Sequence, residues 1–81
     1  MTWVKETTKL TREFSFNDFK TALGFINQVG AIAESNQHHP DILLFNYNHV
    51  RITLTTHDEG NQLTAKDYKL AEEIDKIQKT F

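Results

Sequence analysis

Two adjacent histidines stand directly before the only proline of the chain, in His38-His39-Pro40, and a third, His57, closes a strand-like run over residues 50–57. Imidazole titrates near neutral pH and can both donate and accept a proton, so three such rings in one place would suit general acid/base catalysis. Metal binding is the main alternative, because neutral imidazole is also a common metal ligand. For the pair alone, a loop without any chemical role is the plainest alternative.

Metal binding is the weaker of the two chemistries. A zinc site needs three or four ligands in fixed geometry, and His38, His39 and His57 with Asp67 could supply that number. However, neighbouring side chains of an extended segment point to opposite sides, so the rings of the pair would diverge. No His-x-His or His-x-x-x-His spacing aims two rings at one ion from a single element. We therefore expect metal-free acid/base chemistry.

Two acidic residues flank the histidines in the sequence. Glu34 falls at the end of a helix-like segment, where a carboxylate opposes the helix dipole, which hints at another use for it. Asp67 follows Thr64 at the spacing of a capping box, yet its register also places it on the side of an apolar stripe. It is therefore either a capping acid or a buried site residue. The fourth histidine, His49, falls in an expected turn and is interpreted as a solvated loop residue.

The elements that must position these residues follow from hydrophobic periodicity. Residues 10–16 alternate apolar and polar side chains, and residues 3–8 form a plausible first strand before them. Residues 17–34 predict an amphipathic helix with Asn17 as its N-cap. The main apolar stripe of this helix is Phe19, Ala22, Leu23, Ile26, Gly30 and Ala33, and a second, weaker set is Phe25, Val29 and Ile32.

The second half of the chain repeats the order strand, strand, helix. Residues 42–47 are apolar at both alternations, as in an inner strand, and residues 46–49 supply a turn into a strand that points His57 away from the helices. Pro40 disfavours helical geometry at His39, so the first helix must end before it. The last helix starts after Thr64 and runs to about residue 81, with a buried stripe of Tyr68, Leu70, Ala71, Ile74 and Ile77.

The order β-β-α-β-β-α, with hairpin-length connections, predicts an α+β fold. We expect a four-stranded antiparallel sheet with two helices packed on one face. Nothing in residues 1–81 divides the chain, so it is expected to be a single domain.

Composition narrows the function classes. The absence of cysteine excludes thiolate nucleophiles and fits a reducing compartment, so a cytoplasmic location is expected. The net charge of −2 with scattered lysines gives no basic stripe for nucleic acid, and no apolar run approaches the ~20 residues that span a membrane. A chain of 81 residues buries little surface, so self-association is expected, with the doubly apolar first helix as one candidate contact.

The pattern Glu34, three residues, His38-His39-Pro40, six residues, Tyr47, nine residues, His57, nine residues, Asp67 carries a family resemblance. In composition and in every spacing it resembles the signature of the pterin-4a-carbinolamine dehydratases. The resemblance extends through nearly the whole chain, from Trp3 to the helix start at residues 63–67. The expected order of strands and helices is also similar to that family's fold.

The resemblance implies a lyase that removes water from 4a-hydroxytetrahydrobiopterin or a related 4a-hydroxytetrahydropterin. The product is the quinonoid dihydropterin, in tetrahydrobiopterin recycling, and neither a metal nor an organic cofactor is needed. By family position, His38 and His57 are favoured as the proton-transfer pair, with His39 orienting the substrate and Asp67 completing the catalytic set. The substrate-binding residues implied are Trp3, Glu34, Pro40, Thr56, Asp58, Glu59 and Lys66. Lys66 stands where many animal members have arginine, and lysine offers a point charge instead of a planar fork.

The family also implies partners other than the pterin substrate. Members form homodimers or homotetramers, and some serve as dimerisation cofactors of a homeodomain transcription factor or as assembly factors for a carboxylating enzyme. A non-catalytic protein-binding role is therefore the alternative function. Longer members begin with an extra helix that this sequence lacks, which is expected to bear on higher-order assembly more than on the active site. The residues leave open which pterin is used and which histidine is the acid.

Overall fold

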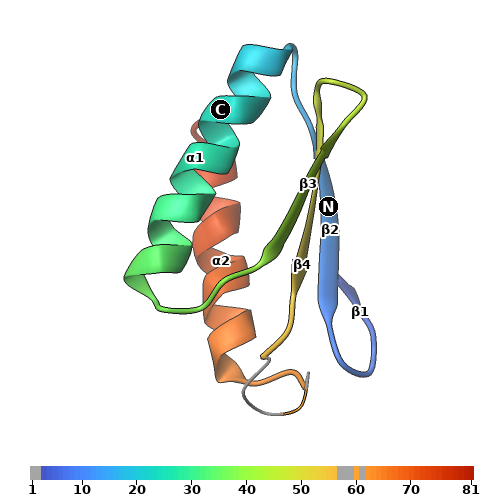
Figure 1. Ribbon diagram of the computed structural model, residues 1–81, viewed down its shortest axis with the longest axis vertical. Coiled ribbons are helices and arrows are strands. Elements are labelled where there is room, and N and C mark those ends of the chain that lie inside the picture. Colours follow the sequence, from blue (N-terminus) through green and yellow to red (C-terminus); the bar gives the residue numbers. More distant parts are fainter. Residues whose placement is uncertain (1–2, 57–59, 61) are drawn as a thin grey trace.

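A computed structural model describes residues 3–56, 60 and 62–81. The elements in chain order are β1 (Val4–Lys5), β2 (Leu10–Ser15), α1 (Phe19–Ser35), β3 (Asp41–Phe45), β4 (His49–Leu54) and α2 (Ala65–Gln78). The four strands form one antiparallel sheet in the order β1-β2-β4-β3, and both helices lie side by side on one face of it (Figure 1). The predicted α+β fold, with the order β-β-α-β-β-α, is confirmed.

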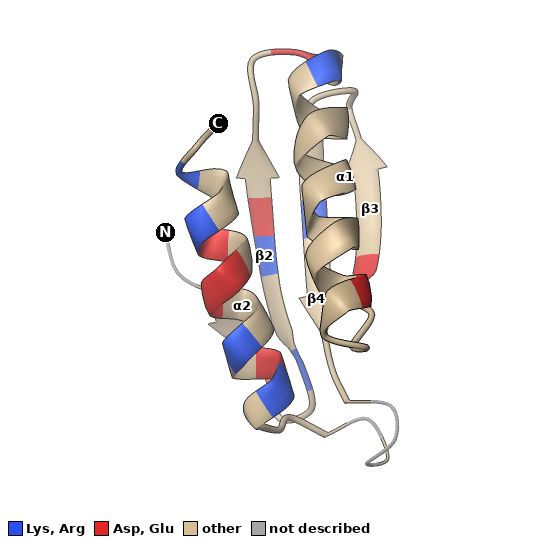
Figure 2. Ribbon diagram, turned by 90° about the vertical axis from the view of Figure 1, so that its left-hand side faces the viewer, with Lys and Arg blue, Asp and Glu red and all other residues tan. Residues whose placement is uncertain are grey.

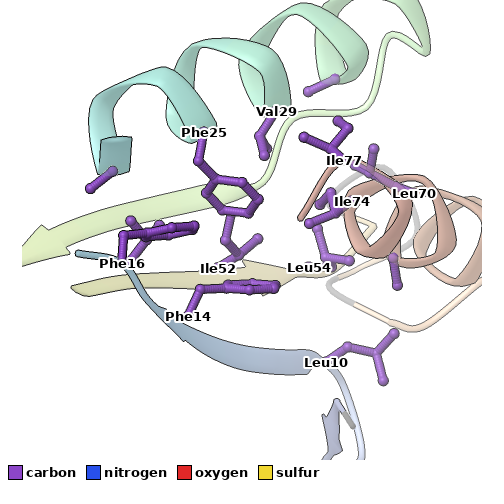
Figure 3. Packing of buried hydrophobic residues seen from close by; sticks show 14 residues of the cluster. Leu10, Phe14, Phe16, Phe25, Val29, Ile52, Leu54, Leu70, Ile74 and Ile77 are labelled. Carbon is purple, nitrogen blue, oxygen red and sulfur yellow. The ribbon is translucent and has the colours of Figure 1, made fainter. Parts of the chain in front are cut away.

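The core lies between the sheet and the two helices (Figure 3). Alternate residues of the central strand β4, namely Val50, Ile52 and Leu54, are fully buried there, as their period of two requires. Helix α2 covers them with Leu70 and Ile74. This packing holds the end of β4 close to the start of α2, which is where the candidate site lies.

Two strands differ from the sequence prediction. The first strand is only Val4–Lys5, not residues 3–8. Strand β3 lies at an edge of the sheet and is not an inner strand. Ile42 and Leu44 pack against the core, but Leu43 on the opposite face is 48% exposed. The apolar residues at both alternations therefore do not reflect burial on both faces.

Helix α1 begins one residue later than predicted, and its buried face combines members of both expected apolar sets. Its N-cap is Asp18, not Asn17, and the Asp18 carboxylate accepts a hydrogen bond from the Thr21 backbone N–H at 2.7 Å. The Thr21 side chain and, after it, this backbone N–H lower the pKa of Asp18 by hydrogen bonding. The buried face consists of Ala22, Phe25, Val29 and Ala33, whereas Phe19, Leu23 and Gly30 from the expected main stripe are exposed.

The rotation of α1 is explained by an aromatic cluster. The Phe25 ring lies 4.8 Å from Phe14 and 4.9 Å from Phe16 between ring centres, and both partners come from the strand β2 side of the core. Both apolar stripes fit the helical period of 3.6 residues, so periodicity alone could not choose between them. Phe25 of the weaker set is completely buried among these rings, whereas Phe19 of the main set, a ring of the same size, is 48% exposed.

Two further predictions are wrong at the level of single residues. Tyr68 is 44% exposed and does not belong to the buried stripe of α2. His49 is not a turn residue but the first residue of β4, and its ring stacks on Phe45 with 5.3 Å between ring centres. The three-residue turn Asn46-Tyr47-Asn48 joins the paired residues Phe45 and His49, and Asn46 and Tyr47 both have positive φ.

Candidate functional site

The end of α1 fixes the position of the histidine pair. Gln37 adopts a left-handed backbone with φ of 53°, its N–H donates to the Glu34 carbonyl, and the His38 N–H donates to the Ala33 carbonyl, each at 3.1 Å. These two bonds are the Schellman motif, which here uses glutamine at the position usually taken by glycine. The helix therefore ends at Ser35, before Pro40 could interrupt it. His38 is the residue at which the backbone leaves the helix.

His38 reaches from the end of α1 to the start of α2. Its Nε2 lies 2.6 Å from Oδ1 of Asp67, although the two residues are 29 positions apart in the sequence. His38 is 8% exposed and Asp67 is completely buried. A histidine and a carboxylate at hydrogen-bonding distance out of water form a unit that can hold and transfer a proton.

The second oxygen of Asp67 is held by two threonines. Oδ2 accepts a hydrogen bond from the Thr56 hydroxyl at 2.7 Å and another from the Thr64 backbone N–H at 3.0 Å. The two hydroxyls also lie 2.7 Å from each other. Thr64 is the N-cap of α2 and Asp67 completes its capping box, as predicted. Asp67 is therefore both the capping acid of α2 and the buried partner of His38.

His39 points the other way and makes a separate, exposed pair. Its Nε2 lies 2.9 Å from Oε1 of Glu34, and both side chains are largely in solvent. This hydrogen bond, followed by the charge of His39, lowers the pKa of Glu34. The side chains of His38 and His39 therefore diverge, as expected. Glu34, whose carboxylate opposes the helix dipole, is hydrogen-bonded to His39.

A small cavity of about 110 Å³ borders His38. Its other lining residues are Asn36, Lys66 and Lys69. Asn36 also joins the two helices, since its side-chain amide donates to Glu73 of α2 at 2.7 Å. Lys66 had been predicted as a site residue, but Asn36, Lys69 and Thr64 had not. The three-residue spacing of Lys66 and Lys69, which places both on one helix face, was the available signal.

The remaining predicted residues are not gathered around His38. Trp3 donates from its ring N–H to Asp75 of α2 at 2.9 Å, and Arg12 donates to the same carboxylate oxygen at 2.6 Å. Asp75 lies eight residues beyond Asp67, about 12 Å further along the helix axis. Pro40 is half-buried beside the histidine pair.

Three predicted site residues, His57, Asp58 and Glu59, lie outside the described residues.

A larger hollow of about 390 Å³ lies elsewhere and contains none of the predicted site residues. Its lining residues are Lys5, Thr7, Thr8, Gln62, Leu63 and Tyr68. Because its lining has no acid/base pair, we place the candidate site at the smaller cavity. Within the described ranges, no three histidine or acidic side chains are grouped so that they could hold a metal ion.

Known proteins resemble this chain over almost its entire length. A protein of Metallosphaera sedula with the provisional name pterin-4-alpha-carbinolamine dehydratase is 44% identical over 77 residues, which are 95% of this chain and 78% of that protein. A protein of Rhodospirillum rubrum with the same provisional name is 51% identical over 70 residues, covering 86% of this chain and 71% of its own.

Two solved structures share the fold. A transcriptional coactivator/pterin dehydratase from Brucella melitensis is 42% identical, with a TM-score of 0.82 over 93% of this chain and 80% of its own. A pterin dehydratase-like protein described as a RuBisCO assembly factor in the alpha-carboxysome has a TM-score of 0.74 over 94% of this chain and 86% of its own. At 21% identity, this second likeness concerns the fold alone.

The model of one protein family matches residues 1–77, and its description is pterin 4 alpha carbinolamine dehydratase. The signature over Glu34, the histidine pair, His57 and Asp67 and the β-β-α-β-β-α fold agree with that match. The chain belongs to the pterin-4a-carbinolamine dehydratase family.

Proposed function

We propose that this protein is a 4a-hydroxytetrahydropterin dehydratase, which removes water from 4a-hydroxytetrahydrobiopterin or a close relative in tetrahydrobiopterin recycling. The observation that carries the proposal is the buried His38–Asp67 pair beside a cavity, in a chain of this family. The reaction breaks the C4a–O bond, releases the oxygen as water and removes a proton from N5. It therefore needs one acid and one base, and no change of oxidation state.

Imidazoles suit both steps, because the proton that one ring takes from N5 and the proton that another gives to the departing hydroxyl balance within a turnover. We assign these transfers to His38 and His57, with Asp67 orienting His38. His39, held by Glu34, is assigned to binding and orienting the pterin. No metal and no organic cofactor is part of this proposal.

The lining residues suggest how a pterin would be held. A cavity of about 110 Å³ is smaller than the ~300 Å³ at the lower end of sites for drug-sized ligands. It would therefore take one edge of the ring system and leave the rest at the surface. Lys66 and Lys69 offer donors to carbonyl or hydroxyl oxygens of that edge. The other binding residues proposed from the family position are Trp3, Glu34, Pro40, Asp58 and Glu59.

The direct test is quinonoid dihydropterin formation from synthetic 4a-hydroxytetrahydropterin. We expect the wild-type protein to accelerate the reaction over buffer, and His38→Ala and His57→Ala each to lower kcat by about 10²- to 10⁴-fold, the usual share of general acid/base catalysis. His49→Ala is the matched control, because His49 stacks on Phe45 in the outer part of the sheet. A wild-type protein without acceleration over buffer would exclude the dehydratase.

A protein-binding role is the second candidate, and the name of the Brucella melitensis relative, which combines a coactivator with a dehydratase, favours it. In that case the partner would bind without turnover of a pterin. Capture of partners from the native cell by wild-type and His38→Ala protein separates the two functions. Binding that survives His38→Ala would assign the partner surface to a region other than the catalytic site.

We also propose that the protein acts in the cytoplasm as a homodimer, with a homotetramer as the larger alternative. The support for pairing is the small core and the uncharged outer surface of α1, where residues 21–33 contain no charged side chain. Neither described helix has the length and apolar character that a membrane crossing requires.

A further inference from the structure

We infer that Thr56 is a positioning residue, whose hydroxyl fixes the Asp67 carboxylate so that neutral His38 carries its proton on Nε2 and offers Nδ1 as the proton acceptor. This inference rests on the proposed dehydratase function for its role in catalysis. It differs from the sequence prediction, in which Thr56 bordered the substrate. It also identifies the ring atom of His38 that exchanges a proton.

Thr56 is buried and has its partners within the protein. The residue is 1% exposed, and its backbone is paired with Gln62 through bonds in both directions, at 3.0 and 3.4 Å. Its hydroxyl lies 2.7 Å from Oδ2 of Asp67 and 2.7 Å from the Thr64 hydroxyl. With both neighbours inside the protein, this hydroxyl has its partners without any substrate.

The hydrogen bonds of Thr64, Thr56 and Asp67 have a defined direction. An ionised carboxylate can only accept, so the single hydroxyl proton of Thr56 must go to Asp67. The bond between the two threonines must then use the Thr64 hydroxyl proton, with Thr56 as acceptor. Thr64 retains a lone pair for the Lys66 backbone N–H at 3.3 Å. One consistent direction therefore leads from Thr64 through Thr56 to Asp67.

The orientation of the Asp67 carboxylate sets the tautomer of His38. With Thr56 and the Thr64 backbone N–H on Oδ2, the carboxylate is held with Oδ1 toward the ring, 2.6 Å from Nε2. Because Oδ1 can only accept, the proton in that bond belongs to Nε2. The other ring nitrogen, Nδ1, then has a free lone pair in neutral His38. A base whose tautomer is fixed before substrate arrives needs no reorganisation to take a proton.

Two substitutions distinguish a positioning role of the Thr56 hydroxyl from a role of the side chain in filling space. Valine has nearly the shape of threonine but cannot donate, so Thr56→Val would leave Asp67 with one donor fewer on Oδ2. The carboxylate could then rotate, and Oδ1 would no longer be directed at Nε2 alone. Serine keeps the hydroxyl and should restore the geometry.

The experiment compares Thr56→Val, Thr56→Ser and Thr53→Val. Thr53 is the matched control, because it lies three residues before Thr56, in β4, with its side chain on the outer face of the sheet, away from Asp67. Nitrogen-15 spectra of the histidine rings report which nitrogen carries the proton. They are recorded at a pH high enough for His38 to be neutral. These spectra require no substrate. Steady-state kinetics with the 4a-hydroxytetrahydropterin provide the second readout.

We expect the Nε2–H tautomer in wild type, Thr56→Ser and Thr53→Val, and a mixture of tautomers in Thr56→Val. We expect kcat of Thr56→Val to fall about tenfold or more, a part of the ~10²–10⁴ available to acid/base catalysis, with KM nearly unchanged. Thr56→Ser should recover most of the rate.

Three outcomes would overturn the inference. Wild-type His38 carrying its proton on Nδ1 overturns it even if Thr56→Val does not fold. A Thr56→Val protein with unchanged tautomer and unchanged kcat does the same. Equal losses in Thr56→Val and Thr53→Val would assign the effect to strand packing. If wild type shows the expected tautomer but no acceleration over buffer, the dehydratase proposal fails and the positioning of His38 stands.

Discussion

At the scale of residues, the neighbouring histidines His38 and His39 belong to two acid–histidine pairs of different character. His38–Asp67 is buried and joins the two helices, whereas His39–Glu34 is exposed and local. Burial strengthens a hydrogen bond and holds its geometry, while solvent screens an exposed pair. We therefore expect the first pair to control catalysis and the second to tune it.

Asp67→Asn tests the buried pair. The asparagine amide would bring N–H donors against the donors of Thr56 and Thr64 or against His38, so at least one buried polar contact is lost. We expect a destabilisation of about 1–3 kcal/mol and a fall in kcat of about 10²- to 10⁴-fold. Urea unfolding and steady-state kinetics measure the two effects. Asp41→Asn, at an exposed residue of β3, is the control and should change neither.

The pH dependence of the exposed pair follows from the lowered pKa of Glu34, whose ordinary value is 4.5. A carboxyl whose pKa is lower in the folded state adds stability above its unfolded pKa, and this contribution is lost as the pH falls through the folded pKa. We expect NMR titration of the Glu34 carboxyl to give a midpoint below 4.5, and His39→Ala to move it back toward that value. A midpoint unaffected by His39→Ala would contradict the pairing.

At the scale of elements, the site depends on how two helices end and begin. The Schellman motif of α1 sets the exit of His38, and the capping box of α2 sets Asp67. The segment that follows β4 places Thr56 beside Asp67. The aromatic packing that sets the rotation of α1 thereby also decides where the histidine pair leaves the helix.

The two apolar sets of α1 give a matched pair of substitutions. Phe25 is completely buried and contacts two other aromatic rings, whereas Leu23 is 38% exposed. We expect Phe25→Ala to lower the free energy of unfolding by about 3–5 kcal/mol and Leu23→Ala to lower it by less than about 1 kcal/mol. Denaturant unfolding of both variants measures these two losses of stability. A reversed order would mean that α1 turns its other stripe to the core.

At the scale of the whole molecule, the charges are distributed unevenly over the two helices. Helix α2 shows basic and acidic residues along its outer side, whereas α1 shows none between its two ends (Figure 2). Its outer surface includes Leu23, Gly30 and Ala31. Uncharged helix surfaces with small residues allow a second helix to approach closely. This is the physical basis of the proposed self-association.

Light scattering at micromolar concentration should give about twice the 9.4 kDa chain mass. Gly30→Glu should shift the protein toward the monomer, because a charge would be placed in the uncharged surface. An added Cβ at Gly30 meets no atom within 4 Å, so the substitution should not disturb the chain itself. Thr7→Glu, which adds the same charge at an exposed position of the β1–β2 connection, is the control. A wild-type monomer would refute the pairing.

The sequence by itself determined the order of elements, the capping box of α2, the divergence of the histidine pair and the family, because these depend on local periodicity and fixed spacings. Only the tertiary structure decided which members of the two apolar sets of α1 are buried, that β3 lies at the edge, and that Thr56 and Thr64 hold Asp67. Local patterns contain the period of a helix but not its rotation about its axis. That rotation follows from long-range packing, as between Phe25 and the rings of Phe14 and Phe16. The same packing brings together His38 and Asp67, which are 29 positions apart in the sequence.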